Sequence, residues 1–249
     1  MRGNPIFREG IELYLIEGHG FVVYGYSLTL LAALEFLILF LPSIDPQTWV
    51  GPANLFKLSS AAALLLIVYS VLRIANQEFV PWRFIALRRW FDGERLSVWD
   101  VAQGQIALLC LHAALLVLLC APLLIWAGAI TRAPAGSVLF TFAVLLFYSL
   151  SYGVWALAAV TVWERRMESR QVFIRCLFIS LVLLSALFYP PVNPVAFLLN
   201  YLGRREMAAL VFWGWKWPAA SVHFLFHFLL LGSGLLLYGA ALRRREGKR

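Results

Sequence analysis

The sequence is poor in charged residues. Only 14% of its 249 residues are Asp, Glu, Lys or Arg, whereas 62% are hydrophobic. A soluble domain of this length needs roughly a quarter of its residues charged to cover its surface. The shortage of charge therefore excludes a soluble globular protein, and the mean hydropathy of +0.79 indicates an integral membrane protein.

Cysteine is also scarce. The three cysteines, Cys110, Cys120 and Cys176, lie in apolar runs and lack C-x-x-C spacing. An odd number of cysteines in such positions argues against a disulfide framework and against a zinc site. We interpret them as small core residues.

Sequence motifs of nucleotide hydrolysis and of common hydrolases are missing. The chain contains no G-x-x-x-x-G-K-[ST] loop to hold phosphates, no G-x-S-x-G turn for a nucleophile and no H-E-x-x-H pair for a metal. We therefore expect that the chain is not itself an enzyme and binds no cofactor directly.

Long apolar runs are abundant. A helix that crosses about 30 Å of hydrocarbon needs roughly 20 residues. The runs of this length are residues 21–41, 55–75, 105–130, 137–163, 172–189 and 221–242. The sequence therefore predicts an all-α, polytopic membrane protein with six transmembrane helices, which form a single transmembrane domain over residues 1–249.

Basic residues are divided unevenly between the two sides that these spans create. If both termini are cytoplasmic, sixteen of the 21 basic residues are cytoplasmic; the other five are Lys57, Arg132, Arg204, Arg205 and Lys216. The positive-inside rule expects this asymmetry, so topology explains the net charge of +8 without a nucleic-acid partner. We expect a bacterial cytoplasmic (inner) membrane protein whose basic tail contacts anionic lipids.

Residues 1–20 precede the first span and carry a helix-start signal. Asn4 followed by Pro5 is typical of an N-cap and a first helical turn. Apolar residues then recur at helical spacing, with acidic and basic residues off that stripe; the stripe consists of Phe7, Ile11, Tyr14 and Leu15. The pattern predicts an amphipathic helix in the membrane interface.

A charged stretch, residues 78–103, separates the second and third spans. A helix from Val80 to Asp92 has an apolar stripe formed by Val80, Phe84, Leu87 and Phe91. The opposite, mixed face consists of Trp82, Ile85, Arg88, Arg89, Trp90 and Asp92. Ser97 and Asp100 match a capping box that starts the third span. Aromatic residues beside arginines are typical anchors of protein interfaces, but a helix that only anchors the chain in the interface has the same composition.

The segment between the fifth and sixth spans, residues 190–218, is long and half apolar. Asn193-Pro194 repeats the helix-start signal, and Gly203 separates two short stretches, Pro194–Leu202 and Arg205–Trp213. Neither stretch is long enough to span a bilayer. We expect an outer helical hairpin followed by an aromatic belt formed by Trp213, Trp215 and Trp217.

Glu35 is an acidic residue inside the first span. A charged carboxylate there is costly unless it is paired, protonated or in contact with water. Lys57, about one turn into the second span, is a candidate partner for an intramembrane ion pair. The alternatives are a polar residue on a translocation path and a protonated glutamate.

Three histidines are weak candidates for a metal or haem site. His223 and His227 are spaced i, i+4 and share one face of the sixth span. His112 lies in the third span at a different depth, so we expect hydrogen-bonded histidines and no metal site.

The layout resembles the six-span membrane subunits of type-2 ABC exporters, the ABC-2 permeases. Glu78 and Gly104-Gln105 occupy places comparable to the glutamate and the Gly-Lys that bound the cytoplasmic coupling helix of this family, with glutamine in place of lysine. Asn193-Pro194 through Trp217 match its outer hairpin. The start of the chain is similar too: Asn4-Pro5-Ile6-Phe7-Arg8-Glu9.

The resemblance implies a permease subunit that forms a homodimer, or a heterodimer with another permease, and that exports a substrate. A separate ATPase subunit would bind ATP and Mg and would dock on the coupling helix. The expected docking residues are Glu78, Arg83, Arg88, Arg89, Trp90 and Asp92. Two alternatives remain: a non-transporting membrane anchor or assembly factor that recruits a cytoplasmic partner, and a haem- or quinone-binding redox subunit.

Overall fold

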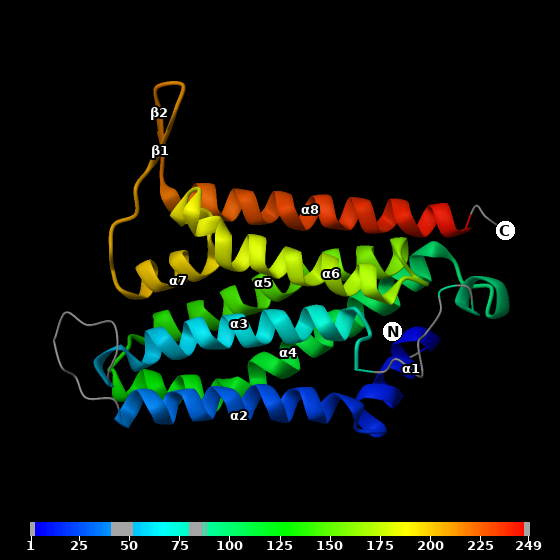
Figure 1. The fold of residues 1–249 in the computed structure, drawn as a ribbon, viewed down its shortest axis with the longest axis horizontal. Coiled ribbons are helices and arrows are strands. Elements are labelled where there is room, and N and C mark those ends of the chain that lie inside the picture. Colours follow the sequence, from blue (N-terminus) through cyan, green and yellow to red (C-terminus); the bar gives the residue numbers. More distant parts are fainter. Residues whose placement is uncertain (1–2, 41–51, 80–86, 88, 247–249) are drawn as a thin grey trace.

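The computed structural model describes residues 3–40, 52–79, 87 and 89–246. In this part of the chain, six helical segments are long and apolar enough to cross a membrane, which confirms the all-α, polytopic fold. These are α2 (His19–Phe40), α3 (Leu55–Ala75), α4 (Val98–Ile130), α5 (Ala135–Val162), α6 with its extension (Met167–Leu187) and α8 (Ala219–Glu246). They run side by side along an elongated bundle (Figure 1).

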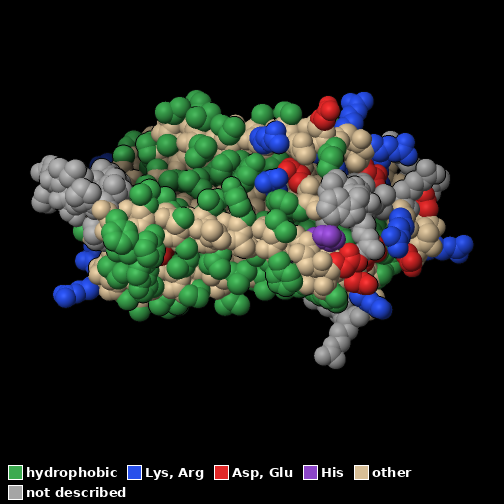
Figure 2. Space-filling model, turned by 60° about the horizontal axis from the view of Figure 1, so that its bottom comes forward, with side chains coloured by type: hydrophobic (Ala, Val, Ile, Leu, Met, Phe, Trp, Pro, Cys, Tyr) green, Lys and Arg blue, Asp and Glu red, His purple; other side chains and the backbone are tan. Residues whose placement is uncertain are grey.

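The two ends of the bundle differ. The N-terminal helix α1 (Pro5–Ile11) and the C-terminus of α8 lie at one end, which we call the α1 end (Figure 1). The short helix α7 (Pro194–Leu202) and a β-hairpin lie at the other, which we call the hairpin end. Hydrophobic side chains cover much of the bundle between them, and acidic and basic side chains gather at the α1 end (Figure 2). This distribution is that of an integral membrane protein.

Helices α3 and α5 form the centre of the bundle, because they are its most buried spans. Helix α5 packs against α8, α3 and α4. A close approach at Gly153 contributes to this packing, since a Cβ there would lie 2.6 Å from Cδ1 of Leu109 in α4. The outer spans α2, α4 and α8 direct large apolar residues such as Phe36, Leu118 and Leu236 outward, as expected of helices in contact with lipid.

Helix α4 begins earlier than the predicted span. Ser97 Oγ accepts a hydrogen bond from Asp100 N at 3.2 Å, and Asp100 Oδ2 accepts one from Ser97 N at 3.2 Å. The capping box is therefore confirmed, and the helix runs without interruption from Val98 to Ile130. With 33 residues it is about 50 Å long, longer than the hydrocarbon core is thick. Its first turns extend past the predicted span, toward α1.

Helix α1 packs against α4, and the buried face of α1 and the turn after it shares only Tyr14 with the predicted stripe. Asn4 caps it as expected, because Asn4 Oδ1 accepts from the amides of Ile6 and Phe7 at 3.1 and 3.3 Å. The buried residues are Ile6, Gly10, Leu13 and Tyr14, whereas Phe7, Ile11 and Leu15 are half-buried. The face is displaced because Gly10 admits the side chain of Leu108 from α4; a Cβ at Gly10 would lie 2.5 Å from it. A π-helical turn, Glu12–Ile16, then links α1 to α2.

The region between α6 and α8 corrects the predicted pair of helices. Helix α7 has the predicted bounds, and Asn193 Oδ1 caps it by accepting from Ala196 N at 2.8 Å. The prediction of a second helix, Arg205–Trp213, is wrong: strands β1 (Leu210–Phe212) and β2 (Trp215–Trp217) form an antiparallel hairpin. The physical reason is the two-residue loop, Trp213-Gly214, whose φ angles of 50° and 77° are those of the turn that best fits a β-hairpin.

Candidate functional site

The charged stretch between α3 and α4 is described in part, and that part lies against the α1 end of the bundle. Its described part comprises residues 78–79, 87 and 89–97 and includes a π-helical turn, Arg89–Gly93. Leu87 and Phe91, two members of the predicted apolar stripe, are buried as expected. The other two stripe residues lie outside the described part of the chain, as do Arg83 and Arg88 of the predicted docking surface.

Trp90 is placed differently from the prediction. The predicted helix placed Trp90 on its mixed face, as part of an exposed docking surface, but the side chain is only 1% exposed. The cause is local, because Trp90 lies in a π-helical turn. Such a turn has more residues per turn than an α-helix, so the 100° rotation per residue of an α-helix does not predict which of its side chains share a face. Trp90 therefore shares the buried side with its neighbour Phe91, while Arg89 and Asp92 remain exposed.

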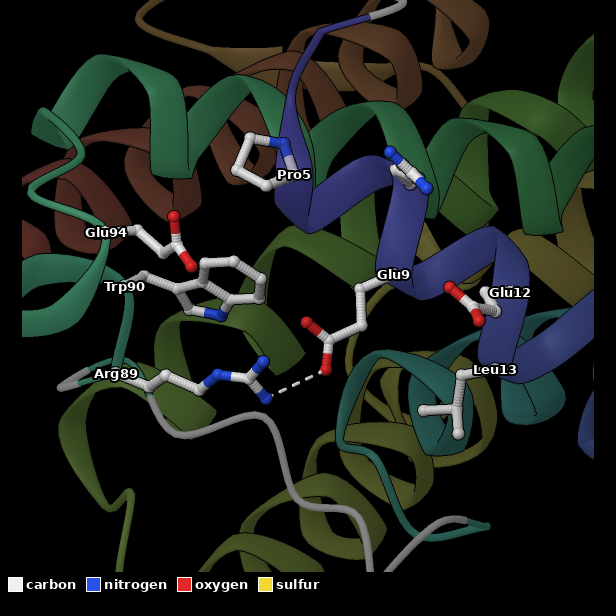
Figure 3. Close-up of a pocket in the computed structure, with 8 residues that line it drawn as sticks. Pro5, Glu9, Glu12, Leu13, Arg89, Trp90 and Glu94 are labelled. Carbon is white, nitrogen blue, oxygen red and sulfur yellow. Dashed lines mark hydrogen bonds and ion pairs between the residues drawn. The ribbon is translucent and has the colours of Figure 1, made fainter.

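A pocket of about 510 Å³ lies between this turn and α1; we call it the α1 pocket. Arg89 crosses it, and its Nη1 is 3.1 Å from Glu9 Oε1 of α1 (Figure 3). The guanidinium of Arg89 also lies 5.4 Å from the ring centroid of Trp90. The lining residues are Pro5, Arg8, Glu9, Glu12, Leu13, Arg89, Trp90 and Glu94. The pocket thus combines apolar side chains with charges of both signs, the composition of a polar protein interface.

Glu78 lies behind this surface and not on it. Its side chain is 3% exposed, and Oε2 accepts a hydrogen bond from Arg73 Nε at 2.8 Å. Asn76 Nδ2 donates to the other carboxylate oxygen at 2.9 Å. Glu78 therefore closes the C-terminal end of α3 through a part-buried ion pair, a structural role that differs from the predicted docking role.

Glu164, just after α5, links the charged stretch to the spans, and the sequence analysis missed it. Its Oε1 accepts from the backbone N–H of Leu87 at 2.6 Å, and its Oε2 is 3.5 Å from Arg245 Nη1 at the end of α8. Arg245 also donates from Nε to the carbonyl of Thr161 at 3.1 Å. Arg170 of α6 is buried and interacts electrostatically with the carboxylates of Glu78 and Glu164.

These contacts, which we call the Glu164 network, join the charged stretch to the ends of α3, α5, α6 and α8. The partners are far apart in the sequence, so residue spacing contains no signal of them. A weak sequence signal is that a charged residue lies near each of these helix ends, but this does not identify which residues pair.

Glu35 and Lys57 do not form the predicted ion pair. The Glu35 carboxyl faces Ser59 of α3, but in the described structure neither of its oxygens has a hydrogen-bond partner. Lys57 lies two residues from Ser59, about 200° around the helix, and its charge faces that of Arg205. The rotation of α3 thus turns the lysine away from α2.

The histidines in α8 form hydrogen bonds to tyrosines of α5. His223 Nδ1 donates to the Pro191 carbonyl at 2.6 Å, and its Nε2 accepts from the Tyr148 hydroxyl at 2.5 Å. His227 repeats the arrangement, with Nδ1 donating to the His223 carbonyl and Nε2 accepting from Tyr152, both at 2.9 Å. All four ring nitrogens therefore have a hydrogen-bond partner, two of them backbone carbonyls and two of them tyrosine hydroxyls.

His112 is apart from that pair. Its Nδ1 hydrogen-bonds the hydroxyl of Tyr24 in α2, and its ring lies edge-on to that of Tyr14, 4.8 Å between centroids. Burial raises the pKa of the Tyr14 hydroxyl, which therefore stays neutral and donates to the Ile74 carbonyl at 3.3 Å. Among residues 3–40, 52–79, 87 and 89–246, no three His, Cys, Asp or Glu side chains converge on a common point that would suit a metal ion.

Comparisons with protein families, with curated proteins and with solved structures give no match for this chain. Any function for the α1 pocket and the Glu164 network therefore rests on their own residues.

Proposed function

We propose that this chain is the membrane subunit of an exporter powered by a separate ATPase, and that the ATPase docks at the α1 pocket. The observation that supports this function is a pair of contacts on one short segment. Arg89, Trp90 and Glu94 line the pocket, and Leu87, two residues before this turn, is bound to Glu164, which faces Arg245 of α8. A surface open to a partner is thus connected directly to the transmembrane helices.

The proposed mechanism is mechanical. A subunit that engages Arg89 and Glu9 pushes on the π-helical turn, which moves with the backbone of Leu87. Because Leu87 N–H is bound to the Glu164 carboxylate, and this carboxylate faces Arg245, the movement reaches the ends of α5 and α8 together. Charge-assisted hydrogen bonds are the strong ones among protein hydrogen bonds, so this is an effective connection. ATP and Mg are bound by the partner subunit in this proposal, and two copies of the complex form the transport unit.

The charged rim of the α1 pocket fits this partner. It presents Arg8 and Arg89 beside Glu9, Glu12 and Glu94, so both signs of charge are available. Rim charges of this kind steer a partner and set its orientation more than they add affinity. The partner surface that complements it carries both acidic and basic residues.

The test is purification of the tagged full-length chain from its own membranes, with identification of bound proteins and measurement of ATP hydrolysis. We expect a subunit with a Walker A motif that is lost together with the ATPase activity in the Glu9→Ala, Arg89→Ala double variant. Arg244→Ala is the matched control, because Arg244 is an exposed arginine at the same end and does not line the pocket. A wild-type preparation without a nucleotide-binding subunit, or a double variant that retains it fully, contradicts the proposal.

A non-transporting anchor uses the same pocket, and the Glu164 network separates the two functions. Glu164→Gln leaves the pocket residues in place but weakens the link to α5 and α8. In an exporter this variant retains the ATPase subunit and loses the stimulation of ATP hydrolysis by substrate. An anchor has no substrate-stimulated ATP hydrolysis to lose, and in that case the variant leaves partner binding unchanged.

A further inference from the structure

The β-hairpin between α7 and α8 presents apolar side chains that the rest of the described chain does not cover. Leu210, Trp215 and Trp217 are 37%, 74% and 45% exposed. The hairpin projects sideways from the hairpin end of the bundle (Figure 1). Single exposed apolar residues are common, but a contiguous group of this kind marks a surface that contacts something.

The strand register gives the hairpin two different faces. Leu210 is paired with Trp217, and Val211 with Lys216. Side chains of directly opposed residues point to the same face, and successive residues of a strand alternate between faces. Leu210, Trp215 and Trp217 therefore share one apolar face, while Lys216 and Val211 share the other. Lys216 is the one charged residue in the two described strands.

The position of the hairpin along the chain sets its depth. Trp217 is two residues before Ala219, where the span α8 begins. At about 3.3 Å per residue, the loop at Gly214 is within about 17 Å of that point along the chain. Because the hairpin points sideways from the bundle, its residues lie at about the same depth along the bundle axis as the ends of the spans. The Tyr189 hydroxyl, after α6, also holds the segment before β1 by donating to the Ala208 carbonyl at 2.9 Å.

We propose that the hairpin lies along the membrane surface, with the Leu210–Trp215–Trp217 face in the lipid and the Lys216 face toward phosphates and water. Tryptophan concentrates at this level of a bilayer because its ring is apolar and its N–H is polar. A lysine on the opposite face extends to the headgroups. Large apolar residues of α8 are exposed as well, at Leu225 and Phe228, which also favours lipid as the occupant. This inference is independent of the proposed ATPase partner.

The test is spin labelling of the full-length chain in lipid nanodiscs. Cys110, Cys120 and Cys176 are replaced by alanine, and single cysteines carrying a nitroxide are placed at Trp215, Lys216 and Trp217. Oxygen, which concentrates in lipid, and a water-soluble nickel complex then compete to relax each label. Labels at Phe228 and Arg244 serve as lipid and water references.

We expect an alternating result. Labels from Trp215→Cys and Trp217→Cys are relaxed mainly by oxygen, as at Phe228, and the Lys216→Cys label mainly by nickel, as at Arg244. Equal nickel access at all three positions overturns the proposal, since the hairpin then lies in water. Oxygen access at all three overturns the assignment of faces, and dipolar broadening between Trp215→Cys labels assigns the face to a second copy instead of lipid.

A second measurement avoids the cysteine replacements. In the chain with its native cysteines, lipids brominated close to the headgroups quench tryptophan fluorescence. We expect Trp215→Phe to remove part of the quenched emission. An unchanged quenched fraction overturns the proposal even if the labelled variants fold poorly.

Discussion

Glu164 is the residue whose removal best tests the link between the charged stretch and the spans. Glu164→Ala removes the acceptor of the buried Leu87 N–H, and leaving such a donor without a partner costs about 1–3 kcal/mol. The pair with Arg245 adds about 0–1 kcal/mol, because Arg245 is 32% exposed and the N–O distance is 3.5 Å. We therefore expect the free energy of unfolding to fall by about 1–4 kcal/mol.

The glutamine variant separates the two contributions. Glu164→Gln retains a carbonyl oxygen that accepts from Leu87 N–H but loses the negative charge that faces Arg245. We expect a smaller loss, about 1 kcal/mol, which is the difference between a charge-assisted hydrogen bond and a neutral one.

The assay is equilibrium unfolding in mixed detergent micelles followed by circular dichroism, combined with hydrogen exchange of residues 87–97. The free energy of unfolding should fall in the order wild type, Glu164→Gln, Glu164→Ala, and exchange in the segment should rise in the same order. Glu168→Ala is the control, since this glutamate is exposed and lies only four residues away. If Glu164→Ala and Glu168→Ala have the same stability and the same exchange, the segment is not held by Glu164 and the reasoning is refuted.

Three further changes test individual contacts. Trp90→Ala should lower the free energy of unfolding by about 3–5 kcal/mol, because the indole is buried. Trp99→Ala, at a residue that is 69% exposed, should change it little. Equal effects of the two variants in denaturant titrations would contradict the burial of Trp90. Gly104→Ala places a Cβ 2.6 Å from Asn4 Oδ1, so we expect α1 to separate from α4. The separation should be seen as faster hydrogen exchange of residues 5–16. Unchanged exchange would show that Asn4 can move aside without releasing α1. Tyr152→Phe leaves Nε2 of the buried His227 without its hydrogen-bond donor, so the free energy of unfolding should fall by about 1–2 kcal/mol in the same titration. An unchanged free energy would mean that water replaces the hydroxyl.

The helices and their caps could be predicted from the sequence because their causes are local. The N-cap at Asn4 and the capping box at Ser97 depend on amides two or three residues away. The six spans follow from a length of apolar sequence that only a membrane accommodates. The β-hairpin was predictable in principle, since a two-residue loop ending in Gly214 sits between short aromatic and β-branched runs, but the helix-start signal at Asn193 favoured helix for the whole segment.

The contacts that shape the candidate site could not be predicted, because they join residues that the sequence separates. Leu87 and Glu164 are 77 positions apart, and Tyr238 and Gln105, whose hydroxyl and amide oxygen are 2.5 Å apart, are separated by 133. The predicted pair of Glu35 and Lys57 failed for a related reason: helix length gives the depth of a residue, but rotation about the axis depends on packing of the whole bundle.

The residues that carry the family resemblance have a structural explanation at the α1 end. Asn4 caps α1 and also donates from Nδ2 to the Asp100 carbonyl at 2.7 Å, and Gly104, one turn further along α4, packs closely against Asn4 and Ile6. An Asn-Pro start and a glycine about one hundred residues later thus act together to dock α1 on the start of α4. This docking forms one wall of the α1 pocket, because it sets the distance from Glu9 to Arg89. Asn4 and Gly104 therefore shape the pocket, whereas Arg8 and Glu9 of the same motif belong to its charged rim, where a search for the partner's contacts should begin.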